Sequence, residues 1–219
     1  MIELLLPPEV VARETRGEIE AALTPAEREA VGKAVDKRVR EFTTARACAR
    51  LALAELGAPA DGIPAGPKGE PVWPEGVAGS ITHCDGFRAA AVARTADVAS
   101  VGIDAEPNAP LPAGLLSDVA GPGEVGHLRS LAGDDPSVAW DRLLFSAKES
   151  VYKTFFPLTG RWLGFEDAEL EVDPGGTFTA TLLVSAKTAG GEPLTGFSGR
   201  WLCQDGLVLT AIARRPGTP

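Results

Sequence analysis

The sequence has few cysteines, no long apolar run and no surplus of basic residues among its 219 positions. Its three cysteines, Cys48, Cys84 and Cys203, are widely spaced and form no CxxC pair, so neither a disulfide framework nor a thiolate zinc site is indicated. No stretch approaches the roughly 20 apolar residues that span a bilayer. The opening segment carries acidic residues where a secretory signal would carry lysines. These absences predict a cytoplasmic protein with no membrane segment.

Acidic residues outnumber basic ones by 30 to 21, which gives a net charge of −9 at pH 7. This balance disfavours nonspecific nucleic-acid binding, which needs surplus Lys and Arg to neutralise phosphates. The charge is uneven, however. Residues 33–50 hold six basic and two acidic side chains, a local charge of +4 that leaves −13 on the rest. An acidic protein with one basic segment can still bind an anionic ligand.

Helix and turn signals in the first half predict helices followed by strands. We expect a strand near residues 2–6 and a helix that begins at Pro25 with Thr24 as its cap. A second helix is predicted over residues 36–56. Three short strands are then predicted, with Asp85-Gly86 as a hairpin turn between the first two. These strands cover residues 77–84, 87–94 and 98–107.

The second half repeats this order. Helices are predicted near residues 115–132 and 137–156, the latter ended by Pro157. Four strands follow, over residues 165–173, 177–184, 197–205 and 207–215. Both halves therefore offer helices followed by strands, which predicts an α+β fold with two similar lobes. We place these lobes at residues 1–105 and 106–219.

Two acidic residues end the third strand, in the segment "VGIDAE" at residues 101–106. Alternation along a strand would put Asp104 and Glu106 on one face, about 6 to 7 Å apart. One interpretation is a solvent-facing strand end that runs into Pro107. The other is a site for a hard divalent cation, Mg²⁺ or Mn²⁺, which prefers oxygen ligands. This spacing alone leaves both open.

The segment "FSAKESVYK", residues 145–153, has the pattern of a helix. Glu149 and Lys153 are spaced i, i+4, which on an exposed face gives an ion pair worth about 0.2 to 0.5 kcal/mol. Lys148 and Lys153 point about 140° away from each other, so both cannot line one flat face. The segment is either an exposed helix with one ion pair or one wall of an anion site.

Taken together, the two segments resemble the 4′-phosphopantetheinyl transferases of the Sfp type (Sfp/EntD-like). A strand that ends in DxE, followed about 45 residues later by a helical FSxKESxxK, is far more restrictive than either part. The supporting matches are "KGEPVWP" at 68–74, "GSITHC" at 79–84 and "RWLGFEDAEL" at 161–170. The last of these resembles the actinobacterial members.

The resemblance implies transfer of the 4′-phosphopantetheine arm of coenzyme A to a serine of an acyl or peptidyl carrier protein, with release of 3′,5′-ADP. It implies Mg²⁺, or Mn²⁺, as cofactor and coenzyme A as substrate. The implied partners are carrier domains of polyketide, nonribosomal-peptide and fatty-acid synthases. The implied form is a monomer whose two lobes, related as in a pseudo-dimer, hold the active site between them.

The resemblance also assigns roles to single residues. Asp104, Glu106 and Glu149 are the implied metal ligands, and we choose Glu149 as the base, with Asp104 and Lys153 as further catalytic residues. Basic and imidazole groups are implied to bind the phosphates of coenzyme A. They are Arg38, Arg46, Lys68, His83, Lys148 and Lys153. From the residues alone, the two arginines could instead lie on a solvated helix face, and His83 could be a buried histidine with its hydrogen bonds satisfied.

For three other side chains the sequence predicts only a position. Arg40 and Arg50 are assigned to the surface, and Trp162 either to the core or to a groove for the pantetheine arm. The sequence also leaves two other functions open. They are a coenzyme A-binding module without catalysis and a metal-dependent hydrolase of nucleotide diphosphates.

Overall fold

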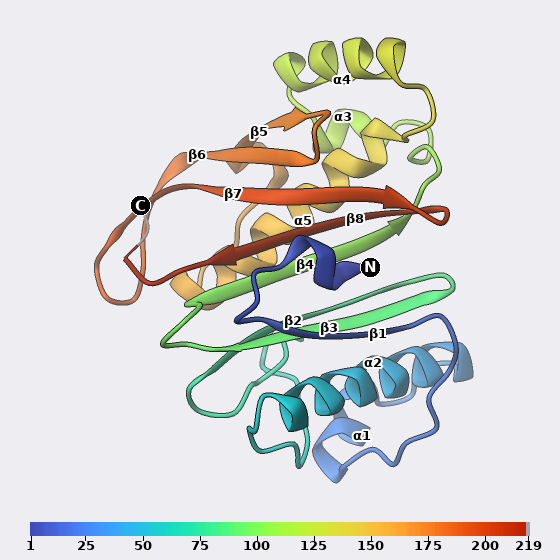
Figure 1. The fold of residues 1–219 in the computed structure, drawn as a ribbon, viewed down its shortest axis with the longest axis vertical. Helices are drawn as coiled ribbons and strands as arrows, with labels where there is room; N and C mark the ends of the chain where they lie inside the picture. Colours follow the sequence, from blue (N-terminus) through green and yellow to red (C-terminus); the bar gives the residue numbers. More distant parts are fainter. Residues whose placement is uncertain (218–219) are drawn as a thin grey trace.

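Two antiparallel sheets, each covered by a long helix, make up the computed structural model in Figure 1, which describes residues 1–217. The smaller sheet has the strand order β1-β3-β2 and the larger one β4-β8-β7-β6-β5. The strands are β1 (Val11–Thr15), β2 (Val77–Cys84), β3 (Phe87–Arg94), β4 (Ser100–Pro107), β5 (Ala168–Asp173), β6 (Thr177–Lys187), β7 (Pro193–Gln204) and β8 (Leu207–Arg214). The helical elements are η1 (Ile2–Leu5), α1 (Pro25–Val31), α2 (Asp36–Glu55), α3 (Leu116–Val119), α4 (Pro122–Asp134), α5 (Trp140–Thr159) and η2 (Phe165–Asp167). This is the α+β, two-lobed fold that the sequence predicts.

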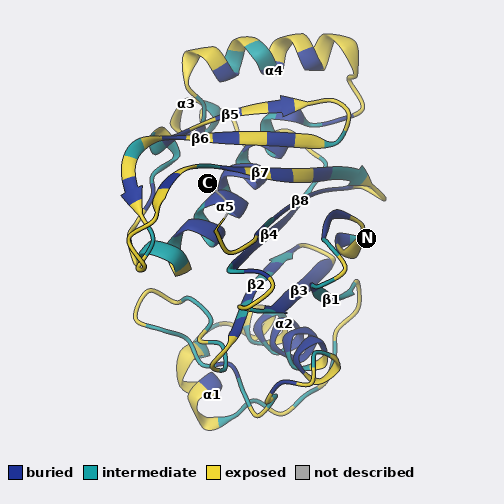
Figure 2. Cartoon of the chain, turned by 60° about the vertical axis from the view of Figure 1, so that its left-hand side comes forward, coloured by how far each residue is buried: buried dark blue, intermediate teal, exposed yellow. Residues whose placement is uncertain are grey.

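Strand β3 is buried on both faces, as the dark blue ribbon in Figure 2 shows. Ala90 and Val92 face α2, while Ala89, Ala91 and Ala93 face a second core. Small side chains suit this position, since they let a helix and a second sheet approach the same strand closely. The first lobe is therefore built around an alanine-rich centre.

The second core lies where the lobes meet. Its members come from β3, from β4 and β8, and from the N-terminal segment. On β4 these are Val101, Ile103 and Ala105, which alternate with the residues that face α5. The opposite face of the larger sheet packs on α5, including an edge-to-face contact between Trp140 and Trp201 with ring centroids 5.2 Å apart.

The edge strands β2 and β4 are joined by side chains. The Ser80 hydroxyl accepts the Ile103 N–H at 3.1 Å, and the Thr82 hydroxyl accepts the Ala105 N–H at 3.1 Å. These bonds satisfy backbone donors that would otherwise be buried and unpaired, a costly state. The two hydroxyls fix β4 against the first lobe on both sides of Asp104.

Several predicted elements are confirmed, and others differ for physical reasons. The expected strand at residues 2–6 is wrong: this segment is the single turn η1, which puts Ile2 and Leu5, three residues apart, into the inter-lobe core. β3 pairs with β2, as predicted, and also with β1, for which the sequence analysis predicts no strand.

Two predicted helix boundaries in the second half also differ from the structure. The helix expected at 115–132 is two helices, because Pro122 starts α4 at a new first turn. Pro157 does not end α5 but lies in its last turn, where its nitrogen cannot donate to the Lys153 carbonyl one turn earlier. The helix ends at Thr159 and is capped by Gly160, whose φ of 65° is left-handed and suits glycine.

The division into residues 1–105 and 106–219 stays a prediction. Its boundary falls inside β4, whose whole length from Ser100 to Pro107 pairs with β8 in the larger sheet. None of the helices described within residues 1–217 is long and apolar enough to cross a bilayer.

Candidate active site

A cavity of about 690 Å³ lies between the lobes. The first lobe lines it with α2, the loop after α2 and β2, and the second lobe with β4 and α5. The predicted site residues in its lining are Arg38, Arg46, Lys68, His83, Asp104, Glu149 and Lys153. Glu106 and Lys148 are not in this lining.

The wall of the second lobe depends on close contact between α5 and β4 at Gly102. A Cβ atom at Gly102 would overlap the Ser150 carbonyl oxygen and the Thr154 hydroxyl, and would lie 3.0 Å from the Thr154 nitrogen. The Ser100 hydroxyl donates to the Thr154 carbonyl at 2.8 Å. Glycine thus lets the helix backbone rest directly on the strand.

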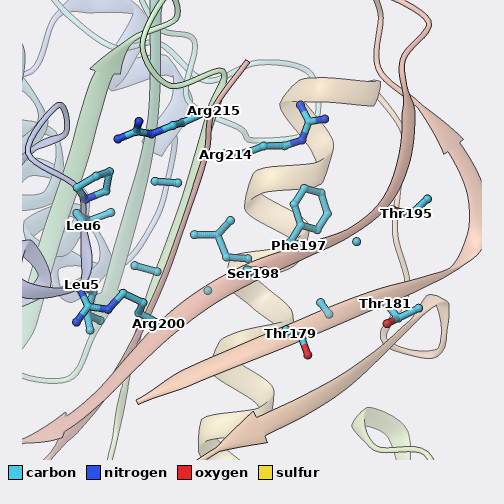
Figure 3. A pocket seen from close by; sticks show the side chains of 17 residues that line it. Leu5, Leu6, Thr179, Thr181, Thr195, Phe197, Ser198, Arg200, Arg214 and Arg215 are labelled. Carbon is cyan, nitrogen blue, oxygen red and sulfur yellow. The ribbon is translucent and has the colours of Figure 1, made fainter. Parts of the chain in front are cut away.

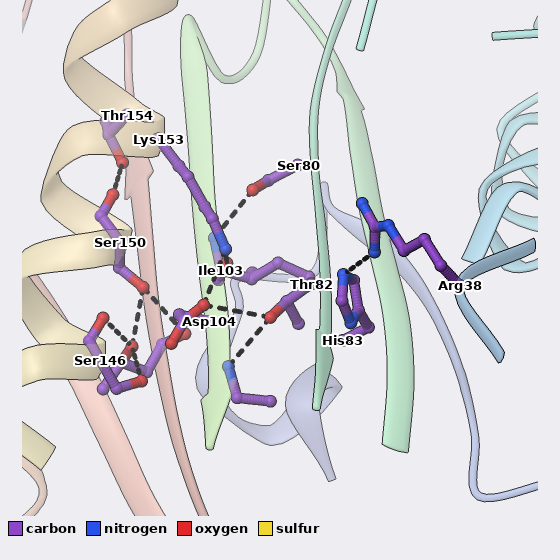
Figure 4. Close-up of polar contacts among 12 residues, drawn as sticks. Arg38, Ser80, Thr82, His83, Ile103, Asp104, Ser146, Ser150, Lys153 and Thr154 are labelled. Carbon is purple, nitrogen blue, oxygen red and sulfur yellow. Dashed lines mark hydrogen bonds and ion pairs between the residues drawn. The ribbon is translucent and has the colours of Figure 1, made fainter. Parts of the chain in front are cut away.

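Buried hydroxyl groups fix the position of α5 along β8 (Figure 4). The Thr210 hydroxyl donates to the Ser146 carbonyl at 2.9 Å and lies 3.0 Å from the Ser146 hydroxyl and 2.7 Å from the Ser150 hydroxyl. The two serines of the "FSAKES" segment therefore hold the helix in register, a role that the sequence reading did not assign. Both are fully buried.

Asp104 meets Lys153 across the contact between strand and helix. Its Oδ1 accepts the Lys153 ammonium at 2.7 Å and the Thr82 hydroxyl at 3.1 Å. Lys153 also donates to the Ile103 carbonyl at 3.1 Å. The second oxygen, Oδ2, is buried and has no hydrogen-bond partner within residues 1–217. An orphaned carboxylate oxygen at a cavity wall is a candidate ligand atom.

Glu149 lies one turn before Lys153 on α5 and is partly buried. Among the described residues its carboxylate has no hydrogen-bond or ion-pair partner. Burial raises the pKa of Glu149, the nearby Asp104 charge raises it further, and Lys153 opposes both. The group is therefore more basic than an ordinary glutamate.

Glu106 points toward the start of α5 and pairs with Arg142, which the sequence reading did not single out. The Arg142 Nη1 lies 2.9 Å from Glu106 Oε2. Burial raises the pKa of Glu106, as does the Asp104 charge, while Arg142 lowers it. Asp104 therefore acts electrostatically on both glutamates.

The three acids fit a hard cation in the chemistry of their donors. All offer carboxylate oxygens, which Mg²⁺ prefers, and Asp104 brings an oxygen without a partner. Within residues 1–217, however, no three acidic, histidine or cysteine side chains are gathered closely enough to enclose an ion. Lys153 and Arg142 instead neutralise one acid each.

The first lobe provides cations on the opposite side of the cavity. Arg46 is buried, donates through Nε to the Ile63 carbonyl at 2.9 Å, and lies 4.3 Å above the Phe42 ring. Burial lowers the pKa of Arg46 to about 10, so it is still charged at neutral pH. Its two terminal nitrogens are free of the Ile63 bond, which leaves a planar fork suited to a phosphate.

Arg38 contacts His83 at the mouth of the same cavity (Figure 4). Burial lowers the pKa of His83, and the charges of Arg38, Lys153 and Arg88 lower it further against the opposing effect of Glu41. Burial and the cationic neighbours therefore both favour the neutral form of His83. An anion between these groups would favour protonation.

Lys148 does not reach this cavity. Its buried ammonium donates to Glu124 Oε2 at 2.9 Å, to the Phe165 carbonyl at 2.8 Å and to the Ala168 carbonyl at 3.0 Å. All three donors of the group are used. The sequence predicts that Lys148 contacts a phosphate, but in the structure its ammonium group links α5 to α4 and β5.

Arg50 is another residue whose placement differs from expectation. We assigned it to the surface, but it pairs with Glu27, whose carboxylate is fully buried, at 2.9 Å. Glu27 also accepts the Ile63 N–H at 3.0 Å. The pair therefore supports the loop whose carbonyl binds Arg46.

A second cavity, of about 410 Å³, adjoins the first at Glu149 and Tyr152, which line both. Its walls are largely apolar and include Val151, Leu163 and Trp162. The Trp162 side chain is 74% exposed, which excludes the core position considered above. Its ring lies against Tyr152, with centroids 4.9 Å apart.

A third hollow, also of about 690 Å³, lies on the larger sheet beside the N-terminal segment (Figure 3). Threonine and serine side chains line it, together with Arg200 and Arg215. Arg200 donates to the Leu4 carbonyl at 3.0 Å and Arg215 to Glu9 at 2.8 Å. None of the predicted site residues lines this hollow, whereas seven of them line the cavity between the lobes.

Comparison with known proteins matches both halves of the chain to one family. Residues 26–93 match the 4′-phosphopantetheinyl transferase N-terminal domain, and residues 100–196 match the 4′-phosphopantetheinyl transferase superfamily. The chain is 58% identical to the 4′-phosphopantetheinyl transferase Svp of Streptomyces mobaraensis over 87% of this chain and 78% of that protein. It is 51% identical to the transferase Npt of Nocardia iowensis over 97% and 99% of the two chains. It is 48% identical to the transferase PptT of Mycobacterium tuberculosis over 87% and 86%.

Proposed function

This chain belongs to the 4′-phosphopantetheinyl transferase superfamily and is an enzyme of that class. From this premise we propose its reaction, the residues that carry it out and its partner proteins. The family transfers phosphopantetheine from coenzyme A to carrier proteins. We propose that this member does so with Mg²⁺ and releases 3′,5′-ADP. The observation that carries the proposal is the cavity between the lobes, with acids on one wall and basic groups on the other.

Coenzyme A would bind with its phosphates toward the first lobe. Arg38, Arg46, Lys68 and His83 line that side of the cavity. An arginine fork can bind two oxygens of one phosphate at once. Anionic phosphates next to His83 would offset the cations that now lower its pKa, so we propose that His83 becomes protonated when coenzyme A binds.

Asp104, Glu106 and Glu149 would hold the metal. Mg²⁺, or Mn²⁺ in its place, supplies charge neutralisation at the diphosphate when it is bound. Asp104 Oδ2 is the oxygen best placed for this role, because it is buried without a partner. Lys153, only 2.7 Å from the other oxygen of Asp104, would then face the oxygens of the transferring group.

Glu149 is the proposed general base. The serine hydroxyl of the carrier must lose its proton as its oxygen attacks phosphorus, and the bond from phosphorus to the 3′,5′-ADP oxygen breaks. Glu149 lines the cavity, and neither oxygen of its carboxylate has a hydrogen-bond partner among the described residues. One oxygen is therefore available to accept the serine proton when the other binds the metal.

The apolar cavity beside Glu149 suits the pantetheine arm. The arm is a long chain with few charges, and such ligands bind in largely apolar grooves. Tyr152 and Trp162 form an exposed aromatic wall there. Since Glu149 and Tyr152 line both cavities, an arm in the second cavity would leave its phosphate beside Glu149.

The proposed partners are acyl and peptidyl carrier domains of polyketide and nonribosomal-peptide synthases. The purified protein should add a phosphopantetheine mass to an apo carrier when coenzyme A and Mg²⁺ are present, and chelation of the metal should stop the reaction. No mass gain over a panel of carriers would refute the proposal. The cytoplasmic location and the monomeric state stay predictions.

A further inference from the structure

We propose that Arg142 is a positioning residue that holds the Glu106 carboxylate ready for the metal ion. This inference rests on the proposed function, because it assumes that Glu106 is a ligand. Arg142 is not part of the "FSAKESVYK" segment and lies at the start of α5, three residues before it. Its own side chain would touch neither the substrate nor the reacting atoms.

The guanidinium group of Arg142 is bound on three sides. Nη1 donates to Glu106 Oε2 at 2.9 Å, Nε to the Ala109 carbonyl at 3.1 Å and Nη2 to the Pro110 carbonyl at 3.0 Å. The side chains of Arg142 and Glu106 are only 17% and 20% exposed. A planar group bound at each of its three nitrogens has one orientation, so the carboxylate it holds has one orientation as well.

Only one oxygen of Glu106 is used in this contact. Oε2 accepts from Arg142, while Oε1 has no hydrogen-bond partner among the residues described. The arrangement therefore leaves one oxygen available for a cation. It corresponds to the hydrogen-bonded outer groups that orient the ligands of metal sites in general.

The loop after β4 is also held by bonds that do not involve Arg142. A role of Arg142 in orienting Glu106 can therefore be distinguished from a role in holding this loop. The Leu111 N–H donates to Asp141 Oδ2 at 2.9 Å. Asn108 accepts the Ala139 N–H at 2.7 Å and donates to the Ser137 carbonyl at 2.8 Å. These bonds tie the loop to the start of α5 without any contact to Glu106. Contact with the carboxylate is therefore what distinguishes Arg142 from its neighbours.

The spacing along α5 puts Arg142 on the same side of the helix as the predicted site residues Glu149 and Lys153. Arg142, Glu149 and Lys153 are spaced i, i+7 and i+11, which puts them on one side of the helix. Arg142 binds Glu106 and Lys153 binds Asp104, so each acid of β4 has its own cation from α5. The two acids can then lie close together before a metal ion arrives, although their charges repel.

The test is a titration of the purified protein with Mn²⁺ in the presence of coenzyme A, in which free Mn²⁺ is measured by electron paramagnetic resonance. Arg142→Gln should weaken Mn²⁺ binding by about 10- to 100-fold, the range for loss of a group that orients a ligand. Asp141→Ala is the matched control, since it loosens the same loop without touching Glu106. It should bind Mn²⁺ as the wild type does.

Equal affinity of Arg142→Gln and the wild type would overturn the proposal, and so would equal weakening by Asp141→Ala. If Arg142→Gln does not fold, Arg142→Lys decides, because it keeps a charge beside Glu106 but cannot form the three-sided contact. It should bind Mn²⁺ more weakly than Asp141→Ala, and equal binding of these two variants would contradict the inference. A wild type that binds no Mn²⁺ would instead refute the metal site of the proposed function.

Discussion

Substitution of Gly102 by alanine tests whether contact between α5 and β4 creates the active site. The added methyl group would overlap the Ser150 carbonyl oxygen and the Thr154 hydroxyl. Neither atom can move freely, because the first is helix backbone and the second donates back to that same carbonyl at 2.8 Å. The helix would have to move away from the strand.

Gly102→Ala should lower both the free energy of unfolding and the rate of carrier modification. An extra methyl group in a packed interior costs about 1 to 3 kcal/mol. The movement would also lengthen the 2.7 Å contact between Lys153 and Asp104 and shift Glu149. A displacement of about 1 Å in a catalytic group can cost about 100-fold in rate, which corresponds to about 2.7 kcal/mol of transition-state stabilisation.

Urea unfolding and the rate of carrier modification measure the two effects separately. Gly126→Ala on α4 is the matched control, since a Cβ atom there meets no heavy atom within 4 Å. It should be neutral or should raise the free energy of unfolding by about 0.5 to 1 kcal/mol, the usual difference between Ala and Gly in a helix. A Gly102→Ala variant with the wild-type rate would refute the reasoning.

The remaining predictions concern single side chains of the site. Because burial raises the pKa of Glu149, its ionised form costs stability; Glu149→Gln should raise the free energy of unfolding at pH 8, and the gain should vanish as the pH falls toward the ordinary carboxyl pKa of about 4.3. An unchanged or growing gain at low pH would contradict this sign. Lys148→Met should lower the free energy of unfolding by about 3 to 5 kcal/mol, because it leaves the buried Glu124 carboxylate without its ion pair. Lys153→Met, at a less buried site, should lower the free energy of unfolding by less and should mainly lower the transfer rate. A larger loss of stability for Lys153→Met than for Lys148→Met in urea unfolding would be evidence against our assignment of the two lysines. Arg46→Gln should weaken coenzyme A binding in calorimetry by about 10- to 100-fold, from the loss of a charged hydrogen bond worth about 1.5 to 3 kcal/mol, while Arg40→Gln should not; equal affinities would remove Arg46 from the site.

The sequence could predict which residues belong to the site better than it could predict which way they face. The spacing of Lys148 and Lys153 already implied directions about 140° apart, but it did not say which direction led to the cavity. The deciding partner of Lys148 is Glu124 on α4, 24 residues away in sequence. No local pattern links the two, so the sequence predicts a phosphate contact for the lysine that in fact points inward.

Contacts between distant strands were equally hidden. Ser80 and Thr82 lie in the predicted strand "VAGSITHC", but their bonds to β4 exist only because the edges of two sheets meet. Strand β1 was missed because its partner β3 lies some 80 residues later. Hairpins such as the one at Asp85-Gly86 carry their own turn signal, and this one was predicted correctly.

The central claim is that Glu149, on the wall formed by α5 and β4, is the general base in the transfer to a carrier serine. The most direct test measures 3′,5′-ADP release and carrier mass together, for the wild type and for Glu149→Gln, with Mg²⁺ and coenzyme A. We predict equal amounts of ADP and modified carrier for the wild type and no ADP without a carrier. For Glu149→Gln we predict neither product, although coenzyme A still binds. Release of ADP without a carrier, or transfer by Glu149→Gln at the wild-type rate, would contradict the claim.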